Sequence, residues 1–285
     1  MTLSTSNIEN LTAMKKYLIL CLALFFMLQS ASIGSATEQE LIAGLAPLKS
    51  MMTLDQNQRK LAELLEKSLK YYEALKNYHA LFYKMEKEEN IMGPTEKIFL
   101  KFEKPWKIYL GWLNTDKKGL QVAYERGKND GKLAIHKPGL LSALVPVIFL
   151  EQSSPWVKQG SASYDIEDAG IGTFLTSFTK AVIKAKQEKR LKIQFQGKAA
   201  SDGLKGEQWE VTFLNSKENS GYFAYRINVL FDEQTALPVH MELYDWKNKP
   251  MGLYEYRDLK VNLSADPEFE KQIDANLLKV YNSSK

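Results

Sequence analysis

Three histidines and one cysteine are the residues that first suggest chemistry. His79, His136 and His240 each lie in or beside a segment predicted to be a strand. No two of them stand with a carboxylate at the spacing typical of a zinc site. Histidine has intermediate burial in ordinary proteins, so we expect three strand or turn residues rather than ligands. The sequence therefore predicts no metal site and no cofactor.

Two further motifs invite a catalytic or anion-binding interpretation. Small residues from Asp168 to Thr173 precede a predicted helix and could aim backbone N–H groups at an anion. The segment lacks the lysine and the further glycines of a phosphate-binding loop, which favours an ordinary helix-entry turn. No Gly-x-Ser-x-Gly elbow occurs, and Asp258 beside Tyr256 and Arg257 fits a surface ion pair. Acids that meet only in space leave a carboxylate-dependent hydrolase open as the least favoured alternative.

The N-terminal segment has the composition of a secretory signal peptide. Lys15 and Lys16 precede an apolar run, Leu18 to Leu28, which is followed by small residues at 34–36. The run is shorter than the roughly 20 residues that a spanning helix needs. We expect residues 1–36 to be a signal peptide, with Met14 as an alternative start, and the protein to be periplasmic. Membrane association through an uncleaved signal is the alternative.

The single cysteine lies inside this apolar run. Cleavage after Ala36 would remove Cys21 and leave no thiol, which excludes disulfides, thiol catalysis and cysteine metal sites. A lipoprotein signal at Cys21 is disfavoured, because no small residue stands directly before it.

The composition is that of a soluble globular protein. The 285 residues are 45% hydrophobic and 25% charged, and the net charge of +4 comes from basic residues spread along the chain. This distribution predicts no nucleic-acid partner, whereas weak attraction to an anionic membrane surface stays open.

Alternating apolar residues predict a series of antiparallel strands in two groups. A helix beginning at Thr53, with Gln56 completing a capping box, precedes the first group, and a second helix over about 171–190 separates the groups. The apolar run at 138–150 is expected to form a short helix broken near Pro146. The predicted strands are 78–88, 96–104, 106–113, 119–126, 132–136, 191–196, 207–214, 222–232, 237–246 and 251–262.

This order of elements predicts an α+β fold. We expect a strongly curved antiparallel sheet that forms an unclosed β-barrel of about ten strands capped by helices. Residues 37–52 would be a lead segment and 53–285 a single half-barrel domain. One face of such a sheet is apolar. If two or three helices leave part of that face uncovered, it could hold an acyl chain or another apolar ligand.

Several segments resemble known families. The order of helix, Asn77 to Phe82, a strand ending in Lys104-Pro105, and Asp130-Gly131-Lys132 is similar to the first half of the periplasmic lipoprotein-carrier (LolA/LolB-like) superfamily. Residues 72–75, 96–102, 127–132 and 168–172 more closely resemble a family of secreted bacterial proteins designated a domain of unknown function. That second resemblance covers about residues 60–270.

The resemblance implies a half-barrel with a hydrophobic interior that shelters the acyl chains of a lipoprotein. Phe82, Pro105 and Asp130-Gly131 carry over by position. Where the carriers place an arginine after the proline, this chain has Ile108 and Tyr109. The resemblance therefore does not extend to an arginine that latches a lid.

These observations predict a non-enzymatic periplasmic protein that binds a lipid, a lipidated protein or another apolar ligand. Transient contact with the membrane surface is a further expected interaction. The alternative is a secreted scaffold with a packed core, acting through exposed loops such as 150–170. We expect the lid to consist of Leu140, Leu141 and Leu144. The predicted cavity wall consists of Phe82, Ile98, Leu100, Phe102, Ile108, Leu110, Phe223, Tyr225 and Ile227.

Overall fold

The structure is a computed structural model that describes residue 48 and residues 55–88, 91–139, 144–155, 166–218 and 220–283. The predicted signal peptide, most of the lead segment, and Leu140 and Leu141 of the predicted lid lie outside the described residues. So do Trp156 and Tyr164 of the loop considered for the scaffold alternative.

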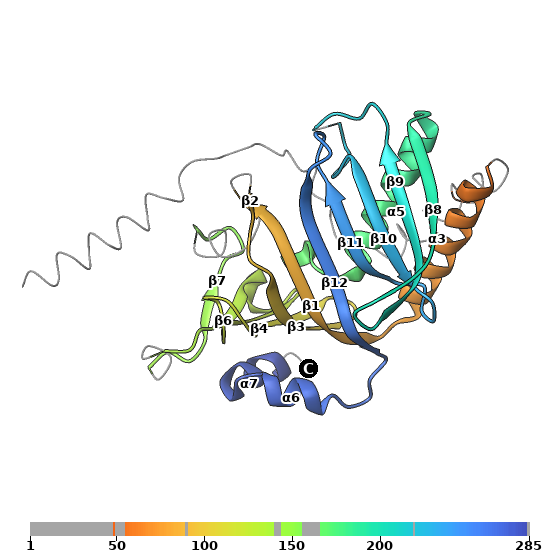
Figure 1. The fold of residues 1–285 in the computed structure, drawn as a ribbon. Helices are drawn as coiled ribbons and strands as arrows, with labels where there is room; N and C mark the ends of the chain where they lie inside the picture. The colour runs from red at the N-terminus through yellow and green to blue at the C-terminus, as the bar shows by residue number, and fades with distance from the viewer. Residues whose placement is uncertain are drawn as a thin grey trace, which may run out of the picture.

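Twelve strands form one antiparallel sheet that does not close into a barrel. The strand order is β7-β6-β5-β4-β3-β1-β12-β11-β10-β9-β8, and β2 pairs with β1 (Figure 1). The first half of the sheet therefore comes from the chain before residue 151 and the second half from residues after 190. The strands are β1 (Asn77–Glu88), β2 (Ile91–Met92), β3 (Glu96–Glu103), β4 (Lys107–Trp112), β5 (Gln121–Glu125), β6 (Leu133–His136), β7 (Ile148–Leu150), β8 (Leu191–Ser201), β9 (Leu204–Phe213), β10 (Arg226–Asp232), β11 (Pro238–Tyr244) and β12 (Pro250–Val261).

Helices cover opposite faces of the sheet (Figure 1). Helices α3 (Gln56–Ala74) and α5 (Ile171–Gln187) contact each other and pack on the face that we call concave. Helices α6 (Pro267–Gln272) and α7 (Ala275–Asn282) pack on the convex face of the first half. The predicted α+β fold with an unclosed antiparallel sheet is confirmed.

Alternation along the strands divides the core between these two faces. In β4, Ile108 and Trp112 belong to the concave core, whereas Tyr109 belongs to a smaller convex core with Phe269 and Tyr281. This division follows from the two-residue period of a strand.

The start of α3 corrects the predicted capping box. Asp55 is the N-cap, and its carboxylate accepts hydrogen bonds from the backbone N–H groups of Asn57 and Gln58. The predicted start at Thr53 was wrong, since the helix begins two residues later than expected; Thr53 itself lies outside the described residues. Gln56 is the first helical residue rather than the third, so its side chain cannot complete a capping box.

The predicted short helix near Pro146 is also wrong in its described part. Ile148–Leu150 form β7, which pairs with β6. β-Branched and aromatic residues favour an extended chain where a strand partner is present, and β6 is that partner.

A third correction concerns the residues before β10. We predicted a strand from 222, but β10 begins at Arg226, so Phe223 and Tyr225 lie in the segment that leads into it. The alternation of Phe223, Tyr225 and Ile227 continues past the strand boundary, which is why periodicity alone placed that boundary too early.

The turn at Asp168–Gly172 is a helix entry, as predicted. Gly170 is the N-cap of α5 with φ 105°, and the Ile171 N–H donates to the Tyr78 hydroxyl at 3.1 Å. A side chain at Gly172 would collide with the Tyr72 ring of α3, so glycine permits the two helices to approach.

Candidate functional site

One row of apolar side chains crosses the concave face of the first half of the sheet. Strand pairing places Leu100 opposite Leu110, Leu110 opposite Val122, Val122 opposite Ile135, and Ile135 opposite Ile148. We call these five residues the apolar row. Paired residues share a face, so the row runs from β3 to the β7 edge.

The apolar row is most exposed at its β7 end and fully buried at its β3 end. Leu100 is fully buried and Val122 is 7% exposed, whereas Leu110 and Ile135 are half-buried and Ile148 is 45% exposed. In the neighbouring row toward the start of β1, the successive partners Tyr78, Phe102, Ile108 and Tyr124 are all buried. The concave face is therefore closed at its centre and apolar where it opens.

The predicted wall residues of β1, β3 and β4 lie together. Their pairings place Phe82 opposite Ile98 and Phe102 opposite Ile108. Ile98, Leu100, Phe102 and Ile108 are buried in the concave core, and Phe82 and Leu110 are half-buried. Sequence alternation thus grouped six residues that share one face, although four of them are at most 2% exposed.

The remaining wall residues belong to the other half of the sheet. Ile227 of β10 is fully buried, while Phe223 and Tyr225 are half-buried in the segment before that strand. Phe223 contacts Phe174 of α5 edge to face. Strands β3, β1, β12 and β11 separate β10 from β4 in the sheet order. A ligand role for any of the nine residues stays a prediction.

Of the predicted lid, only Leu144 can be described. Its side chain is 81% exposed, and the nearby Pro146 carbonyl oxygen lies 2.8 Å from His136 Nδ1, which donates to it. Leu144 does not pack down on the concave face in this arrangement, and the lid role stays a prediction.

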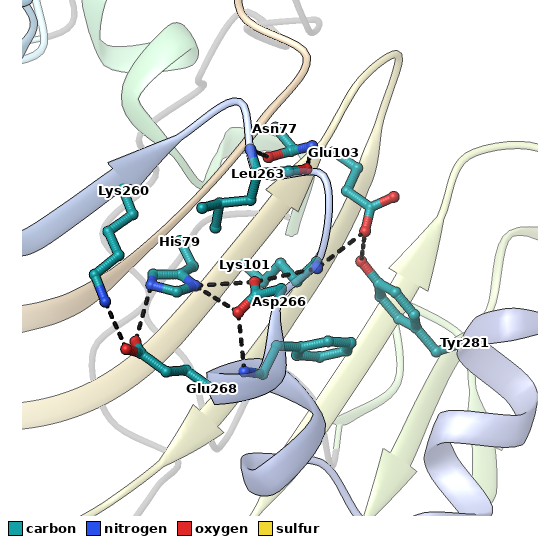
Figure 2. A network of polar contacts seen from close by, with 10 residues as sticks. Asn77, His79, Lys101, Glu103, Lys260, Leu263, Asp266, Glu268 and Tyr281 are labelled. Carbon is teal, nitrogen blue, oxygen red and sulfur yellow. Dashed lines mark hydrogen bonds and ion pairs between the residues drawn. The ribbon is translucent and has the colours of Figure 1, made fainter.

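A buried polar network lies on the opposite, convex face of the same strands (Figure 2). His79 of β1 places Nδ1 2.9 Å from both carboxylate oxygens of Asp266 and Nε2 3.2 Å from Glu268. Lys101 of β3 lies 3.2 Å from Asp266 and 3.4 Å from Glu103, and Glu103 accepts from the Tyr281 hydroxyl at 3.0 Å. We call His79, Lys101, Glu103, Asp266 and Tyr281 the C-terminal clamp.

The clamp fastens α6 and α7 to the sheet. Asp266 is also the N-cap of α6, accepting from the Phe269 N–H at 3.1 Å. A second set of bonds acts alongside: Gln121 donates to the Gln272 carbonyl at 3.1 Å and accepts from the Asp274 N–H at 2.7 Å. Side chains from the strands thus bind both helices at their ends.

The electrostatics of the clamp fit a structural role better than a catalytic one. Burial alone would raise the pKa of Asp266, but hydrogen bonds from His79 and the Phe269 N–H, together with Lys101, lower it. Burial, and then Glu103, raise the pKa of Tyr281. Both ring nitrogens of His79 face carboxylates, so neither is directed toward a substrate proton or a metal.

A polar pocket of about 250 Å³ adjoins the clamp, between the convex face and α6–α7. Lys107 of β4 also lines it and donates to the Tyr281 carbonyl oxygen at 2.6 Å. None of the nine predicted wall residues lines this pocket. Within the described part of the chain, no group of three His, Cys, Asp or Glu side chains is arranged to hold a metal.

A second polar network covers the convex face of the other half of the sheet. His240 lies 2.9 Å from Glu255 and 3.4 Å from Glu242, which also accepts from the Tyr244 hydroxyl at 2.8 Å. Hydrogen bonding by His240 lowers the pKa of Glu242 to about 2. Burial alone would lower the pKa of His240, but the two glutamates raise it. A hydrolase acid needs the opposite shift, so this pair fits a structural role.

Sequence reasoning missed the clamp, although part of its signal was visible. Phe269, Ile273, Leu277 and Tyr281 recur every four residues and form the buried side of α6–α7. Asp266 before Pro267 is a helix-start pattern. The partners of His79 lie more than 180 residues away in sequence, which no local pattern reveals.

A family model covers most of the described chain. The model, described as "Protein of unknown function (DUF1571)", matches residues 75–274. The predicted resemblance to a domain-of-unknown-function family is thereby confirmed. No curated protein matches the chain.

Solved structures give weaker similarities. Lipoprotein LppX of Mycobacterium tuberculosis is 12% identical, with 78% of this chain and 94% of LppX covered and a TM-score of 0.39. A LolA superfamily protein of Nitrosomonas europaea is 10% identical over 73% of this chain and 96% of its own, with a TM-score of 0.33. An uncharacterized conserved protein of Thermus thermophilus is 6% identical, with 76% and 96% covered and a TM-score of 0.40.

Proposed function

This chain belongs to the DUF1571 family, and we propose that it is a non-enzymatic periplasmic protein that binds an acyl chain along the apolar row. The acyl chain would belong to a lipid or to a lipidated protein. It would enter from the β7 edge and lie across β6, β5 and β4 on the concave face.

The exposed β7 end of the apolar row is the observation that carries this proposal. Ile148, Ile135 and Leu110 offer accessible apolar surface, and the row ends at fully buried Leu100. Each methylene group that leaves water contributes about 0.8 kcal/mol, and the ordering of ligand and side chains offsets part of that gain. An apolar row without charged members needs no catalytic group to hold such a ligand.

The polar networks support the non-enzymatic part of the proposal. The groups of the C-terminal clamp are occupied in binding α6 and α7, and the His240 network lies on the opposite face from the apolar row. Among the described helices, none is long and apolar enough to cross a membrane. Periplasmic location rests on the predicted signal peptide, and sequencing the N-terminus of the exported protein tests it.

A packed scaffold is the second candidate, and the burial of the predicted wall favours it. Ile98, Leu100 and Ile108 are at most 2% exposed in a core closed by α3 and α5. In that case the apolar row is the partly exposed margin of a packed core, and apolar ligands do not bind to it.

Titration with a dansyl-labelled fatty acid distinguishes the two candidates. We expect saturable fluorescence enhancement with the exported protein and a loss of roughly tenfold in affinity for Ile135→Asn, because a polar group would interrupt the row. Ile183→Asn is the matched control, since Ile183 is also half-buried but lies on α5.

Thermal unfolding of both variants shows whether a loss of binding reflects unfolding. Absence of uptake by the unmodified protein, together with lipid-free organic extracts of gently purified material, would overturn the acyl-chain proposal in favour of the packed scaffold.

A further inference from the structure

Helices α3 and α5 pack against each other as an antiparallel pair over the concave face. At one end the Lys186 ammonium donates to the Gln58 side chain at 2.8 Å, and at the other end Gly172 adjoins the Tyr72 ring. The two contacts are the same number of residues apart in both helices, so each position between them has a counterpart across the interface. We call this interface the helix seam. Residues three, four or seven positions apart form its two sides: Gln58, Leu61, Leu65, Ser68 and Tyr72 on α3, and Gly172, Thr176, Thr179 and Lys186 on α5.

Three hydroxyl groups lie in the middle of the helix seam. The two end contacts place Ser68 opposite Thr176, and Thr179 lies about one turn further along α5. Ser68 is 0% exposed, Thr176 5% and Thr179 2%. Within the described part of the chain, none of the three hydroxyl groups has a hydrogen-bond partner. Serine and threonine in a helix can bond the carbonyl oxygen one turn earlier, and these three do not.

Such an arrangement is unfavourable for a core that serves packing alone. A buried hydroxyl without a partner has given up its hydrogen bonds to water and gained none. The seam residues next to these hydroxyls on α3, Leu61 and Leu65, are fully buried and apolar. Apolar side chains of similar size at the hydroxyl positions would pack there without that cost. Buried donors without partners therefore point to a group that binds between the helices.

The chemistry of the seam favours a neutral acceptor. Hydroxyl groups donate hydrogen bonds without carrying charge. The lysines at the two ends are engaged, because Lys186 donates to Gln58 and Lys104 donates to the Tyr72 carbonyl oxygen. A carboxylate in the middle would lose its hydration without gaining a cation. An ester or amide carbonyl carries no charge, and its two lone pairs can accept from two hydroxyl groups.

The seam begins beside the buried end of the apolar row. Leu100, the last residue of the row, pairs with Ala80 of β1. Two residues earlier on β1, the Tyr78 hydroxyl accepts from the Ile171 N–H at the start of α5. Gly172, the first seam residue of α5, follows directly. A ligand that extends past Leu100 therefore meets the seam.

We propose that the hydroxyl groups of Ser68, Thr176 and Thr179 bind an ester or amide carbonyl of the ligand. This rests on the proposed function and names its ligand class, a lipid whose acyl chain lies on the apolar row and whose carbonyl group reaches the helix seam. The three side chains are enclosed by α3 and α5, so binding requires the two helices to move apart at Ser68.

Infrared spectroscopy of a labelled carbonyl tests the proposal. The exported protein is loaded with methyl palmitate carrying ¹³C at the carbonyl carbon. We expect the carbonyl band at a lower frequency than for the same ester in hexane, because the bound carbonyl accepts hydrogen bonds. The double variant Thr176→Val/Thr179→Val should return the band toward the hexane position and weaken ester binding roughly tenfold. Ser177→Ala is the matched control, since the Ser177 hydroxyl also lacks a partner but lies off the seam stripe of α5, and it should change neither reading.

Urea denaturation of the ligand-free protein gives a second test. The double variant should be at least as stable as the unmodified protein, because it loses no internal hydrogen bond. A clear loss of stability would show that the hydroxyl groups are bonded within the protein, and it would overturn the proposal. A band at the hexane position in the unmodified protein, or an unchanged band in the double variant, would also overturn it.

Failure of the proposed function gives a different result. If the unmodified protein takes up neither the dansyl fatty acid nor the ester, both proposals are overturned. If it takes up both but the ester band stays at the hexane position, only the seam proposal is overturned. Dansyl fatty-acid uptake should persist in the double variant, because the apolar row is unchanged.

Discussion

The two faces of strands β1 and β3–β6 are closed by different means. The convex face binds α6 and α7 through the C-terminal clamp, where hydrogen-bonded ions meet at 2.9–3.4 Å. The concave face carries the apolar row, whose most exposed member is Ile148 at the β7 edge. Hydrogen-bonded ion pairs have one favourable geometry, whereas apolar contact is non-directional. The convex face is therefore suited to fix a segment, whereas the concave edge offers apolar contact without one fixed geometry.

Breaking the clamp should have the largest effect. Asp266→Ala removes a buried carboxylate that His79 and Lys101 share, along with the N-cap of α6. We expect about 3–5 kcal/mol loss in the free energy of unfolding, measured by urea denaturation, because His79 and Lys101 both lose their buried carboxylate partner. Glu268→Ala is the control, since Glu268 is 53% exposed, and it should lower the free energy of unfolding far less than Asp266→Ala does. Equal effects of the two substitutions would show that the clamp is not a buried unit.

Truncations along the apolar row sharpen the comparison on the concave side. Leu100→Ala should cost about 3 kcal/mol of unfolding free energy, because a fully buried side chain leaves a cavity. Ile135→Ala should cost about 1 kcal/mol, because its surroundings are already open. Equal costs in urea denaturation would indicate that the row is packed throughout, as the scaffold candidate requires.

Acid should weaken the convex networks more than the apolar row. The pKa of Asp266 is lowered, and the pKa of Glu242 is lowered to about 2. The stabilisation from both carboxylates is therefore complete above the unfolded values near pH 4. It is lost as the pH falls through the folded values. The raised pKa of His240 acts in the opposite direction: its stabilisation is complete below the ordinary value of 6.5 and is lost as the pH rises through the folded value.

Urea midpoints measured between pH 2 and 8 check this profile, with Glu242→Gln as the matched variant. The variant should lose part of the acid dependence of the midpoint. It should lose only part of the dependence due to His240, because Glu255 still faces that ring. A midpoint independent of pH in both proteins would contradict the role assigned to these ion pairs.

The smallest effect concerns the helix that covers the concave face. Asp55→Ala removes the N-cap of α3 and should lower the unfolding free energy by about 1 kcal/mol, measured by thermal or urea unfolding. Asp55→Ser should retain most of that stability, because serine also accepts from the helix N–H groups. A full loss with serine would show that the charge, not the cap geometry, is what matters.

Local patterns predicted the strands well because each strand has its own alternation of apolar residues. Strand pairing then placed Leu100 opposite Leu110, in the manner expected for short antiparallel connections. The edge strand β7 was missed because three residues beside Pro146 carry too little period to separate strand from helix. The clamp was missed for another reason: His79 and Asp266 meet only after the whole sheet has formed.

Photolabelling tests the central claim most directly. A fatty acid with a diazirine near its methyl end is bound to the exported protein, irradiated, and mapped by mass spectrometry of peptides. The apolar row predicts labels on peptides containing Leu110, Val122 or Ile135, and competition by unlabelled fatty acid. Labels confined to β9–β11 or to the C-terminal helices, or labels that resist competition, would contradict a binding site on this row.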